Sequence, residues 1–311
     1  MRKLAACALA GTAALLVFSP AMGAQPDIAR VHWATPVRRA FVAHFSNASK
    51  AEVDLRPQIR KYHLRIRDQG QRSDCTVFAT TFLIEYAKSS STKPKPNELS
   101  EDYLNWAGNQ ALGTANDGGF FTEFISGFDG YGISGARAMP DKPVYSASYV
   151  PKAKVVSRAE AMFVPRYPID IVKVWDDQTG MTAAELASVL GYLRAGVPVA
   201  SGFWWLNTFQ TETIDGIPLL KDYPRTPSAP LTDGHTIDLV GFHQSSAFPG
   251  GGYFIFRNSW GTGFGDKGYG FMSFEYFLTW GNDGIVIPPR PWPPAPLPTR
   301  PIIPHGSALP M

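Results

Sequence analysis

The sequence predicts an α+β fold with two lobes, because helical spacing of apolar residues comes early in the chain and strand-like runs come late. The clearest helix begins at Cys75, where Ser73 or Asp74 can cap its start. Its apolar residues are Val77, Phe78, Phe82 and Tyr86. The clearest strands are His235–Phe242 and Tyr253–Arg257. With 311 residues, 44% of them hydrophobic, the chain can bury a sizeable core.

The remaining elements follow from turn signals and apolar runs. Residues 51–74 are expected to be mostly extended, with Pro57 and an Asp68-Gln69-Gly70 turn. Residues 108–153 are rich in Gly, Pro and Asn and are expected to form an ordered loop. In chain order we further expect a short helix at Leu99–Trp106, a helix at Ala183–Leu193, a strand at Val197–Trp204 and, after a Gly-rich turn at 261–270, a last strand or short helix.

Both ends of the chain differ in composition from its middle. A basic start, an apolar run to about Phe18 and small residues ending at Ala24 are typical of a secretory signal peptide over residues 1–24. We therefore expect an exported protein, secreted or periplasmic. Residues 25–50 form a short N-terminal pro-like segment. Residues 288–311 contain 10 of the 27 prolines and are expected to be an extended, exposed tail.

Composition also excludes several classes of function. The formal net charge is only +3 and no run of Lys and Arg stands out, so nucleic acid is not an expected partner. After the signal no segment is apolar enough to span a bilayer, so the exported chain is not expected in a membrane. No residue set has metal-ligand spacing and no Gly-rich loop suggests a nucleotide, so neither metal nor cofactor is expected. We expect a monomer.

One cysteine remains after the signal is removed, because Cys7 leaves with it and Cys75 has no partner. A lone thiol in an exported protein is either buried and inert or reactive. At the start of a helix the partial positive charge favours the thiolate, which is the nucleophilic form. The local sequence around Cys75 therefore favours a reactive residue.

A reactive thiolate also needs a histidine and a group that orients the imidazole ring. His235 lies at the head of an apolar strand after a Thr232-Asp233-Gly234 turn, whereas His243 follows the other end of that strand, roughly 25 Å away. His235 is the better candidate. Asn258 can accept a hydrogen bond from the imidazole without adding charge, and Trp260 can shield that bond from water.

At this point the sequence resembles the papain family of cysteine peptidases over residues 51–287. The segments that carry the resemblance, in the family's order, are Val53-Asp54-Leu55-Arg56, Gln69-Gly70 six residues before Cys75, Leu99-Ser100-Glu101, Asp117-Gly118-Gly119, Gly196-Val197-Pro198-Val199, Gly234-His235 and Asn258-Ser259-Trp260-Gly261-Thr262-Gly263. The last segment is highly specific. The resemblance implies a papain-like two-lobed fold, a helical lobe followed by a β-barrel-like antiparallel lobe, with the active-site cleft between them.

The resemblance also implies an activity. It implies hydrolysis of peptide bonds in protein or peptide substrates through a Cys-His-Asn triad and a thioester acyl-enzyme. Cys75 would be the nucleophile, His235 the base and Asn258 the residue that orients it. Gln69 and the backbone N–H of Cys75 would hold the oxyanion, and Trp260 would cover the contact between His235 and Asn258.

Substrate-binding residues follow from the same resemblance. Gly118 and Gly119 would pair with the substrate backbone, since glycine permits close approach. Phe120 and Phe121 follow where the family builds part of its second specificity pocket, which predicts an apolar residue two positions before the cut. Two further aromatic residues, Trp204 and Trp205, either line the cleft or pack in the core.

The departures from the family pattern concern the surroundings of Cys75. Arg72 replaces a common cysteine, and the position of its disulfide partner is Asn116, so both ends of that bridge are absent. Thr76 replaces a common Trp. Asp74 places a carboxylate beside the nucleophile, and its charge would oppose the thiolate unless it points to the helix cap or to solvent. Two alternatives therefore stay open: a catalytically weak or inactive papain-like binding protein, and a Cys-His amidase acting on cell-wall peptides.

Overall fold

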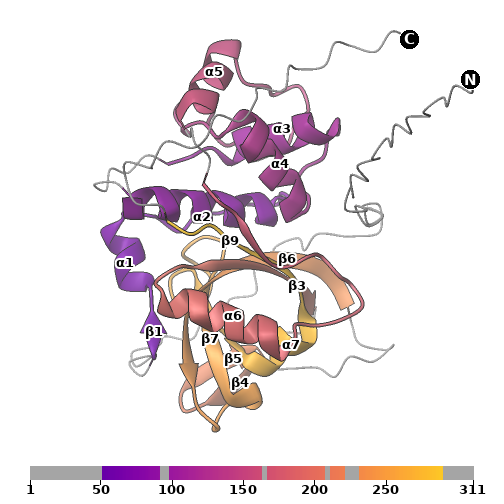
Figure 1. The fold of residues 1–311 in the computed structure, drawn as a ribbon. Coiled ribbons are helices and arrows are strands. Elements are labelled where there is room, and N and C mark those ends of the chain that lie inside the picture. The colour runs from indigo at the N-terminus through magenta and orange to yellow at the C-terminus, as the bar shows by residue number, and fades with distance from the viewer. Residues whose placement is uncertain (1–50, 92–97, 163–166, 207–210, 221–230, 290–311) are drawn as a thin grey trace, which may run out of the picture. The chain divides into compact units, whose positions relative to one another are not determined.

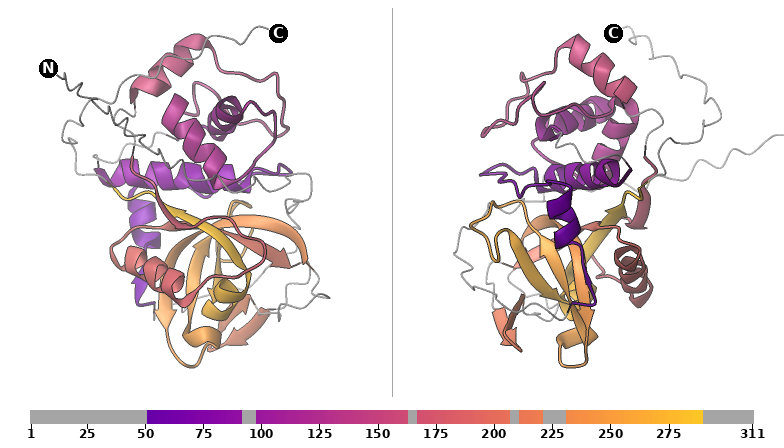
Figure 2. Two further views of the ribbon diagram at one scale, coloured as in Figure 1. Left: turned by 45° about the vertical axis from the view of Figure 1, so that its right-hand side comes forward. Right: turned by 90° about the vertical axis from the view of Figure 1, so that its left-hand side faces the viewer.

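The computed structural model describes residues 51–91, 98–162, 167–206, 211–220 and 231–289. The predicted signal peptide, the segment 25–50 and nearly all of the Pro-rich tail lie outside these residues. The described residues belong to one compact unit. They form the predicted α+β fold, with helices on one side of the long helix α2 (Cys75–Ser91) and a sheet on the other (Figures 1 and 2).

The described strands form one mixed sheet that is mostly antiparallel. Its order is β2-β9-β3-β6-β7-β8-β5-β4, with β1 paired to β6. The strands are β1 (Val53–Asp54), β2 (Asp170–Lys173), β3 (Val199–Leu206), β4 (Thr211–Ile214), β5 (Ile217–Leu220), β6 (Leu231–Gln244), β7 (Gly252–Arg257), β8 (Tyr269–Ser273) and β9 (Gly281–Val286). Only β5 and β8 run parallel. The path has two ends, so the sheet resembles a barrel wall but is not closed.

The helices are divided between the two halves of the fold. They are α1 (Arg56–Lys61), α2, α3 (Glu101–Leu112), α4 (Phe121–Tyr131), α5 (Ala153–Met162), α6 (Ala183–Arg194) and α7 (Phe274–Trp280), with a short 3-10 turn at Pro249–Gly251. Helices α3 and α4 pack on α2 and α5 packs on α4, whereas α6 and α7 lie against the sheet (Figure 1). None of the helices in these ranges combines the length and the apolarity that crossing a bilayer requires.

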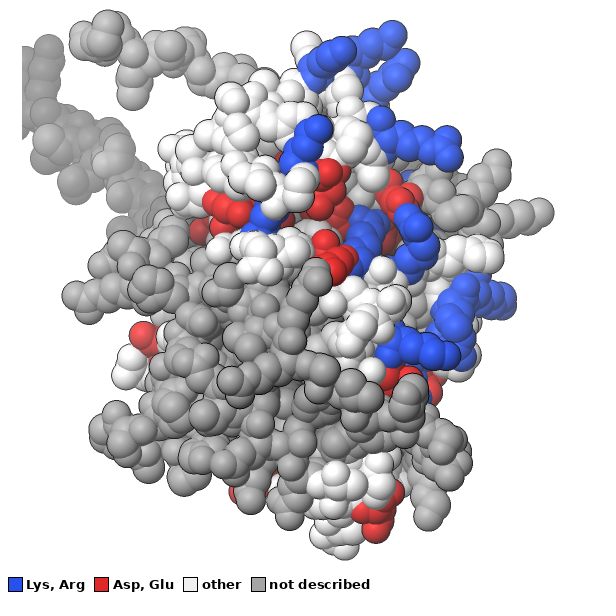
Figure 3. All heavy atoms as spheres, turned by 180° about the vertical axis from the view of Figure 1, so that it is seen from behind, with Lys and Arg blue, Asp and Glu red and all other residues white. Residues whose placement is uncertain are grey.

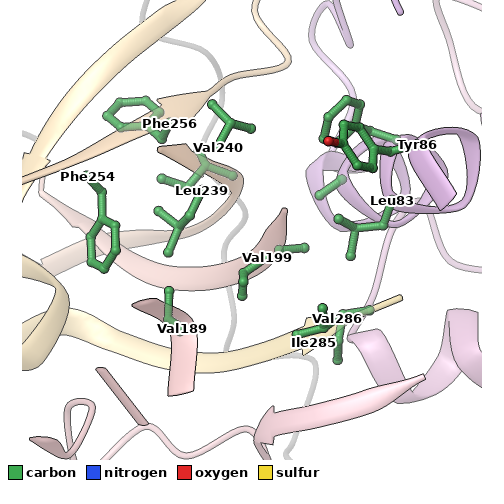
Figure 4. Close-up of a cluster of buried hydrophobic side chains, with 14 of the residues drawn as sticks. Leu83, Tyr86, Val189, Val199, Leu239, Val240, Phe254, Phe256, Ile285 and Val286 are labelled. Atoms are coloured by element: carbon green, nitrogen blue, oxygen red, sulfur yellow. The ribbon is translucent and has the colours of Figure 1, made fainter. Parts of the chain in front are cut away.

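Helix α2 joins the two halves because apolar side chains surround it on all sides. Leu83 and Tyr86 face the strand residues Val199, Val240 and Val286 across a continuous buried cluster (Figure 4). The hydroxyl of Tyr86 donates to the carbonyl oxygen of Gly196 at 3.0 Å. Helix α2 is thereby held against the sheet.

Two predictions about the N-terminal half were wrong. The segment 51–74 contains helix α1, which begins with Pro57 in its first turn, a position where proline is favoured because the missing N–H would be unpaired anyway. Residues 108–153 are not a loop, because α4 lies within them and α3 extends to Leu112. Gly127 contributed to the prediction of a loop, but it lies within α4. A Cβ there would lie 2.4 Å from the backbone nitrogen of Gly108, so this glycine permits close packing of α3 and α4.

The C-terminal half contains the predicted strands with different bounds. Strand β6 begins at Leu231, so Thr232-Asp233-Gly234 is strand rather than turn, because Gly234 and Asp233 pair with Trp204 and Trp205 of β3. The single last element predicted after the Gly-rich turn is three elements, β8, α7 and β9. Ser273 accepts a hydrogen bond from Tyr276 N, which starts α7 directly after β8.

Candidate active site

Cys75 is the first residue of helix α2 and its side chain is buried. The carbonyl of Asp74 accepts the first helical hydrogen bond, from the backbone N–H of Phe78 at 3.1 Å, so Asp74 is the residue at the N-cap. The Cys75 thiol hydrogen-bonds to Thr236, the residue that follows His235 in β6. The fold therefore brings Cys75 against the residue that follows His235 in β6, although 161 residues separate Cys75 from Thr236 in sequence.

His235 and Asn258 meet in the pairing that the sequence predicted. His235 lies on β6 and Asn258 follows the end of β7, and His235 Nε2 lies 2.8 Å from Asn258 Oδ1. Since the amide oxygen can only accept, Nε2 carries the proton. The other ring nitrogen, Nδ1, is buried and has no hydrogen-bond partner among the described residues. Nδ1 is thus left as a proton acceptor.

Two tryptophans enclose the His235 ring. Trp260 stacks on it, with ring centroids 4.5 Å apart and planes 28° apart. Trp205 contacts it edge-on at 4.9 Å, which places Trp205 at the site and in the core at once. These contacts exclude water from the bond between His235 and Asn258 and restrict rotation of the ring.

The loop that carries Gln69 is attached to the loop that carries Asn258 and Trp260. Gln69 N donates to Ser259 O at 2.8 Å, and Gly261 N donates to Arg67 O at 2.9 Å. The Ser259 hydroxyl donates to Gln69 Oε1, and Gln69 Nε2 donates to Arg72 O at 2.9 Å. Because an amide NH₂ has two hydrogens, one remains for a further acceptor. Ser259 is a positioning residue that sequence reasoning missed, although it lies in the most specific motif.

Thr76 and Thr236 form a second link between α2 and β6. Their hydroxyl oxygens lie 2.9 Å apart, and both side chains are buried. Each residue follows a predicted catalytic residue, Cys75 or His235, in the chain. Thr76 replaces an aromatic residue of the family pattern, so this hydrogen bond fixes the spacing of the two elements where a larger side chain would otherwise pack.

Burial disfavours charge on both Cys75 and His235. Burial raises the pKa of the Cys75 thiol to about 11, although hydrogen bonds from Thr236 act in the opposite direction. Burial lowers the pKa of His235 to about 4, although its hydrogen bond to Asn258 acts against this. Each group alone is therefore neutral near pH 6, and a thiolate with an imidazolium forms only where each charge stabilises the other.

Arg72 is the centre of a buried ionic cluster that includes Asp74, the residue before Cys75. Its guanidinium donates to Asp102 Oδ1 at 2.6 Å, to Asp117 Oδ1 at 2.8 Å and to Asp141 Oδ1 at 3.1 Å, and it lies 3.0 Å from Asp74 Oδ2. Asp117 directly follows Asn116, so the ion pair of Arg72 and Asp117 links the two loops that the family's disulfide would link.

The same cluster decides what Asp74 does. Its carboxylate points neither to solvent nor to a cap hydrogen bond, since the side chain is fully buried and its oxygens accept no hydrogen bond within the described residues. Burial raises the pKa of Asp74 well above its usual value, although Arg72 acts against this. A charged Asp74 raises the pKa of Cys75, and burial of Asp74 limits how much of that charge is present.

Three of the predicted substrate-binding residues, Gly118, Gly119 and Phe121, also have packing roles inside the protein. Gly118 has φ +84° and a Cβ there would lie 2.0 Å from Ser73 O, so only glycine fits beside the start of α2. A Cβ at Gly119 would meet the buried carboxylate of Glu123. Both glycines are thus required by internal packing as well. Phe121 packs in the hydrophobic core.

Phe120 contacts an aromatic residue from a distant segment. Its ring lies 5.2 Å from that of Trp175 in an edge-on arrangement, and Trp175 follows β2 in the chain. Trp175 is half-buried. It carries no motif of its own, so sequence reasoning had no signal that would have found it.

Comparisons with known proteins agree with this geometry. The family model described as papain family cysteine protease matches residues 222–277, which include His235, Asn258 and Trp260. Oryzain gamma chain from Oryza sativa subsp. japonica is 27% identical over 214 residues, covering 66% of this chain and 50% of that protein. The chain thus spans about half the length of that curated relative.

Solved structures show the same fold. Xylellain, a cysteine protease from Xylella fastidiosa, superposes with a TM-score of 0.59 at 20% identity, covering 84% of this chain and 92% of that one. Digestive procathepsin L2 from Tenebrio molitor gives a TM-score of 0.52 at 18% identity, over 79% of this chain and 70% of that one. This chain is therefore similar to papain family cysteine proteases in sequence over residues 222–277, and it shares the fold of the solved cysteine proteases.

Proposed function

We propose that this chain is an exported cysteine peptidase, of bacterial type, that hydrolyses peptide bonds with Cys75, His235, Asn258 and Gln69. The observation that carries the proposal is the state of the His235 ring. His235 Nε2 is hydrogen-bonded to Asn258 Oδ1 at 2.8 Å, and His235 Nδ1 is buried without a partner among the described residues. The next residue in β6, Thr236, is hydrogen-bonded to the Cys75 thiol. An imidazole with no role beyond the surface would need neither the hydrogen bond from Nε2 to Asn258 nor the burial of Nδ1.

In the proposed reaction His235 Nδ1 takes the proton of the Cys75 thiol. The sulfur then attacks the peptide carbonyl carbon, and a C–S bond forms while the carbonyl oxygen becomes an anion. The free amide hydrogen of Gln69 and the backbone N–H of Cys75 hold that oxyanion. His235 returns the proton to the leaving amine as the C–N bond breaks, and water activated by His235 hydrolyses the thioester.

Proton transfer within a neutral pair suits this enclosed site. Burial penalises both the Cys75 thiolate and the His235 imidazolium. We therefore expect the proton to move from Cys75 to His235 at the same time as the sulfur attacks the carbonyl carbon. Asn258 orients the ring throughout, and Trp260 covers the hydrogen bond between them.

The test is digestion of an unfolded, carboxymethylated protein near pH 6 by the purified exported chain, with products identified by mass spectrometry. We expect cleavage by the wild type and none by Cys75→Ala or His235→Ala. Alkylation of Cys75 by iodoacetamide is measured in parallel. Equal cleavage by wild type and Cys75→Ala would refute the proposed nucleophile.

The burial of the reacting pair favours a second candidate, a papain-like binding protein with little activity. It predicts no cleavage by folded wild type and no alkylation of Cys75 at neutral pH. Alkylation without cleavage of proteins would instead indicate a different acyl substrate, such as the cell-wall peptides of an amidase.

We further propose that Phe120 and Trp175 form an apolar wall that receives a substrate side chain two positions before the cut. In Phe120→Ala and Trp175→Ala the ratio of kcat/KM for Leu over Lys at that position should fall about tenfold, or 1.4 kcal/mol. Paired synthetic peptides measure this ratio. Phe121→Leu, in the core, is the matched control and should leave it unchanged. An unaltered ratio in the first two variants would contradict the wall.

A further inference from the structure

A second pocket lies in the helical half of the fold, away from Cys75. Its volume is about 540 Å³, within the range of small-molecule sites. It lies between the C-terminal part of α2, helix α5 and the loop 134–138. Lys88, at its α2 wall, is thirteen residues beyond Cys75, which is roughly 20 Å along a helix. The pocket is therefore separate from the candidate active site.

The lining of this pocket is strongly cationic. Four of its side chains are basic and one is acidic, and they are Arg65, Lys88, Arg137, Arg158 and Glu98. Glu98 is already paired with Arg65. Arg137 and Arg158 are exposed, and within the described part of the chain neither forms an ion pair. Lys and Arg side chains gather on the rear face of the molecule (Figure 3).

Lys88 contributes a half-buried cation from the α2 wall of the pocket. Burial lowers its pKa, although Glu85 acts in the opposite direction. The four basic residues come from four separate segments, so the charge is concentrated by the fold and not by a run in the sequence.

The floor of the pocket is apolar and held by backbone hydrogen bonds. Leu99 and Ala159 are buried, and Val155 and Met162 of α5 line the same pocket, Met162 with 51% of its surface exposed. Leu99 pairs with Gly135, and Ala136 N donates to Glu98 O at 2.8 Å. These bonds form the pocket before any ligand arrives, which reduces the cost of binding.

We propose that this pocket binds a small amphiphilic anion. Lys88, Arg137 and Arg158 hold its acidic group, and a short apolar chain lies against Val155 and Met162. The acidic group is a phosphate or a carboxylate, and the experiment below distinguishes between these two groups. The site is independent of the peptidase function and remains testable if Cys75 proves inactive.

The test is titration calorimetry of the full exported chain with octyl phosphate, octanoate and inorganic phosphate, each at low and high salt. We expect octyl phosphate to bind with one-to-one stoichiometry and at least tenfold more tightly than inorganic phosphate, which lacks the apolar chain. Octanoate binding as tightly as octyl phosphate would identify a carboxylate ligand, and weaker binding a phosphate ligand. Affinity should fall with salt.

Two residues of one helix provide a matched pair of variants. Arg158→Glu should weaken octyl phosphate binding at least tenfold, whereas Lys154→Glu, an equal charge change at an exposed α5 position outside the lining, should weaken it less than twofold. Met162→Gln should weaken octyl phosphate but not inorganic phosphate. Equal effects of Arg158→Glu and Lys154→Glu, non-stoichiometric uptake, or no binding by the folded wild type would overturn the proposal.

Discussion

At the scale of single residues, Asn258 decides which nitrogen of His235 carries the proton. Its Oδ1 also accepts the backbone N–H of Ser259 at 2.8 Å, so the side chain cannot rotate away from the ring without loss of two hydrogen bonds. Trp260 stacks over the same ring. The proton position on His235 is therefore set by the protein rather than by solvent.

Substitution of Asn258 tests this assignment. Asn258→Ala should lower kcat about tenfold or more, at least 1.4 kcal/mol, because the ring loses the partner that holds its tautomer. Asn258→Asp keeps an acceptor but adds a carboxylate, which raises the pKa of His235 from about 4. The acidic limb of the activity profile should then move to higher pH. A profile with an unmoved limb would show that Asn258 only stabilises the fold.

At the scale of elements, the Arg72 cluster joins the loop before α2 to the loop before α4. Arg72 accepts the Gln69 amide on its backbone carbonyl while its guanidinium binds Asp117. Asp117 precedes Gly118, which lies against Ser73. One buried cation thus holds the loop that carries Gln69 and the segment that carries Gly118 together, where the family pattern has a disulfide.

Removal of that cation should be costly. Arg72→Met leaves buried Asp74 and Asp102 without their counter-charge and should reduce the free energy of unfolding by about 3–5 kcal/mol. Arg194→Met is the control, because its pair with Glu52 is exposed and should contribute less than about 1 kcal/mol. Urea unfolding measures both. Similar losses in the two variants would mean that the cluster has no special role.

At the scale of the whole molecule, buried carboxyl groups set how stability depends on pH. Burial raises the pKa of Asp283 and of Glu123 to about 7 and that of Glu101 to about 8. The folded chain therefore holds protons that the unfolded chain, with pKa values near 4, releases. Between pH 4 and the folded pKa, stability contributed by these groups decreases as pH rises.

This reasoning predicts lower stability at pH 7.5 than at pH 5. Asp283→Asn should reduce that difference by about 1 kcal/mol or more, because Asn can still accept from Gly202 N, which lies 2.8 Å from Asp283 Oδ1, but does not ionise. Exposed Asp177→Asn should leave the difference unchanged. Urea unfolding at the two pH values measures the slope. A wild type that gains stability toward pH 7.5 would contradict the prediction.

The α+β class and the candidate residues around Cys75, His235, Asn258 and Gln69 could be predicted from the sequence, because each depends on local pattern or on a short motif. Helix α4 could not, since its glycines signal a loop locally, and only the close approach of α3 shows why Gly127 is there. Tertiary structure alone decided that Arg72 meets Asp117, that Trp175 meets Phe120 and that Arg137 and Arg158 share one pocket. Each of these contacts joins segments distant in sequence, and such contacts depend on how the elements pack rather than on the residues near each position.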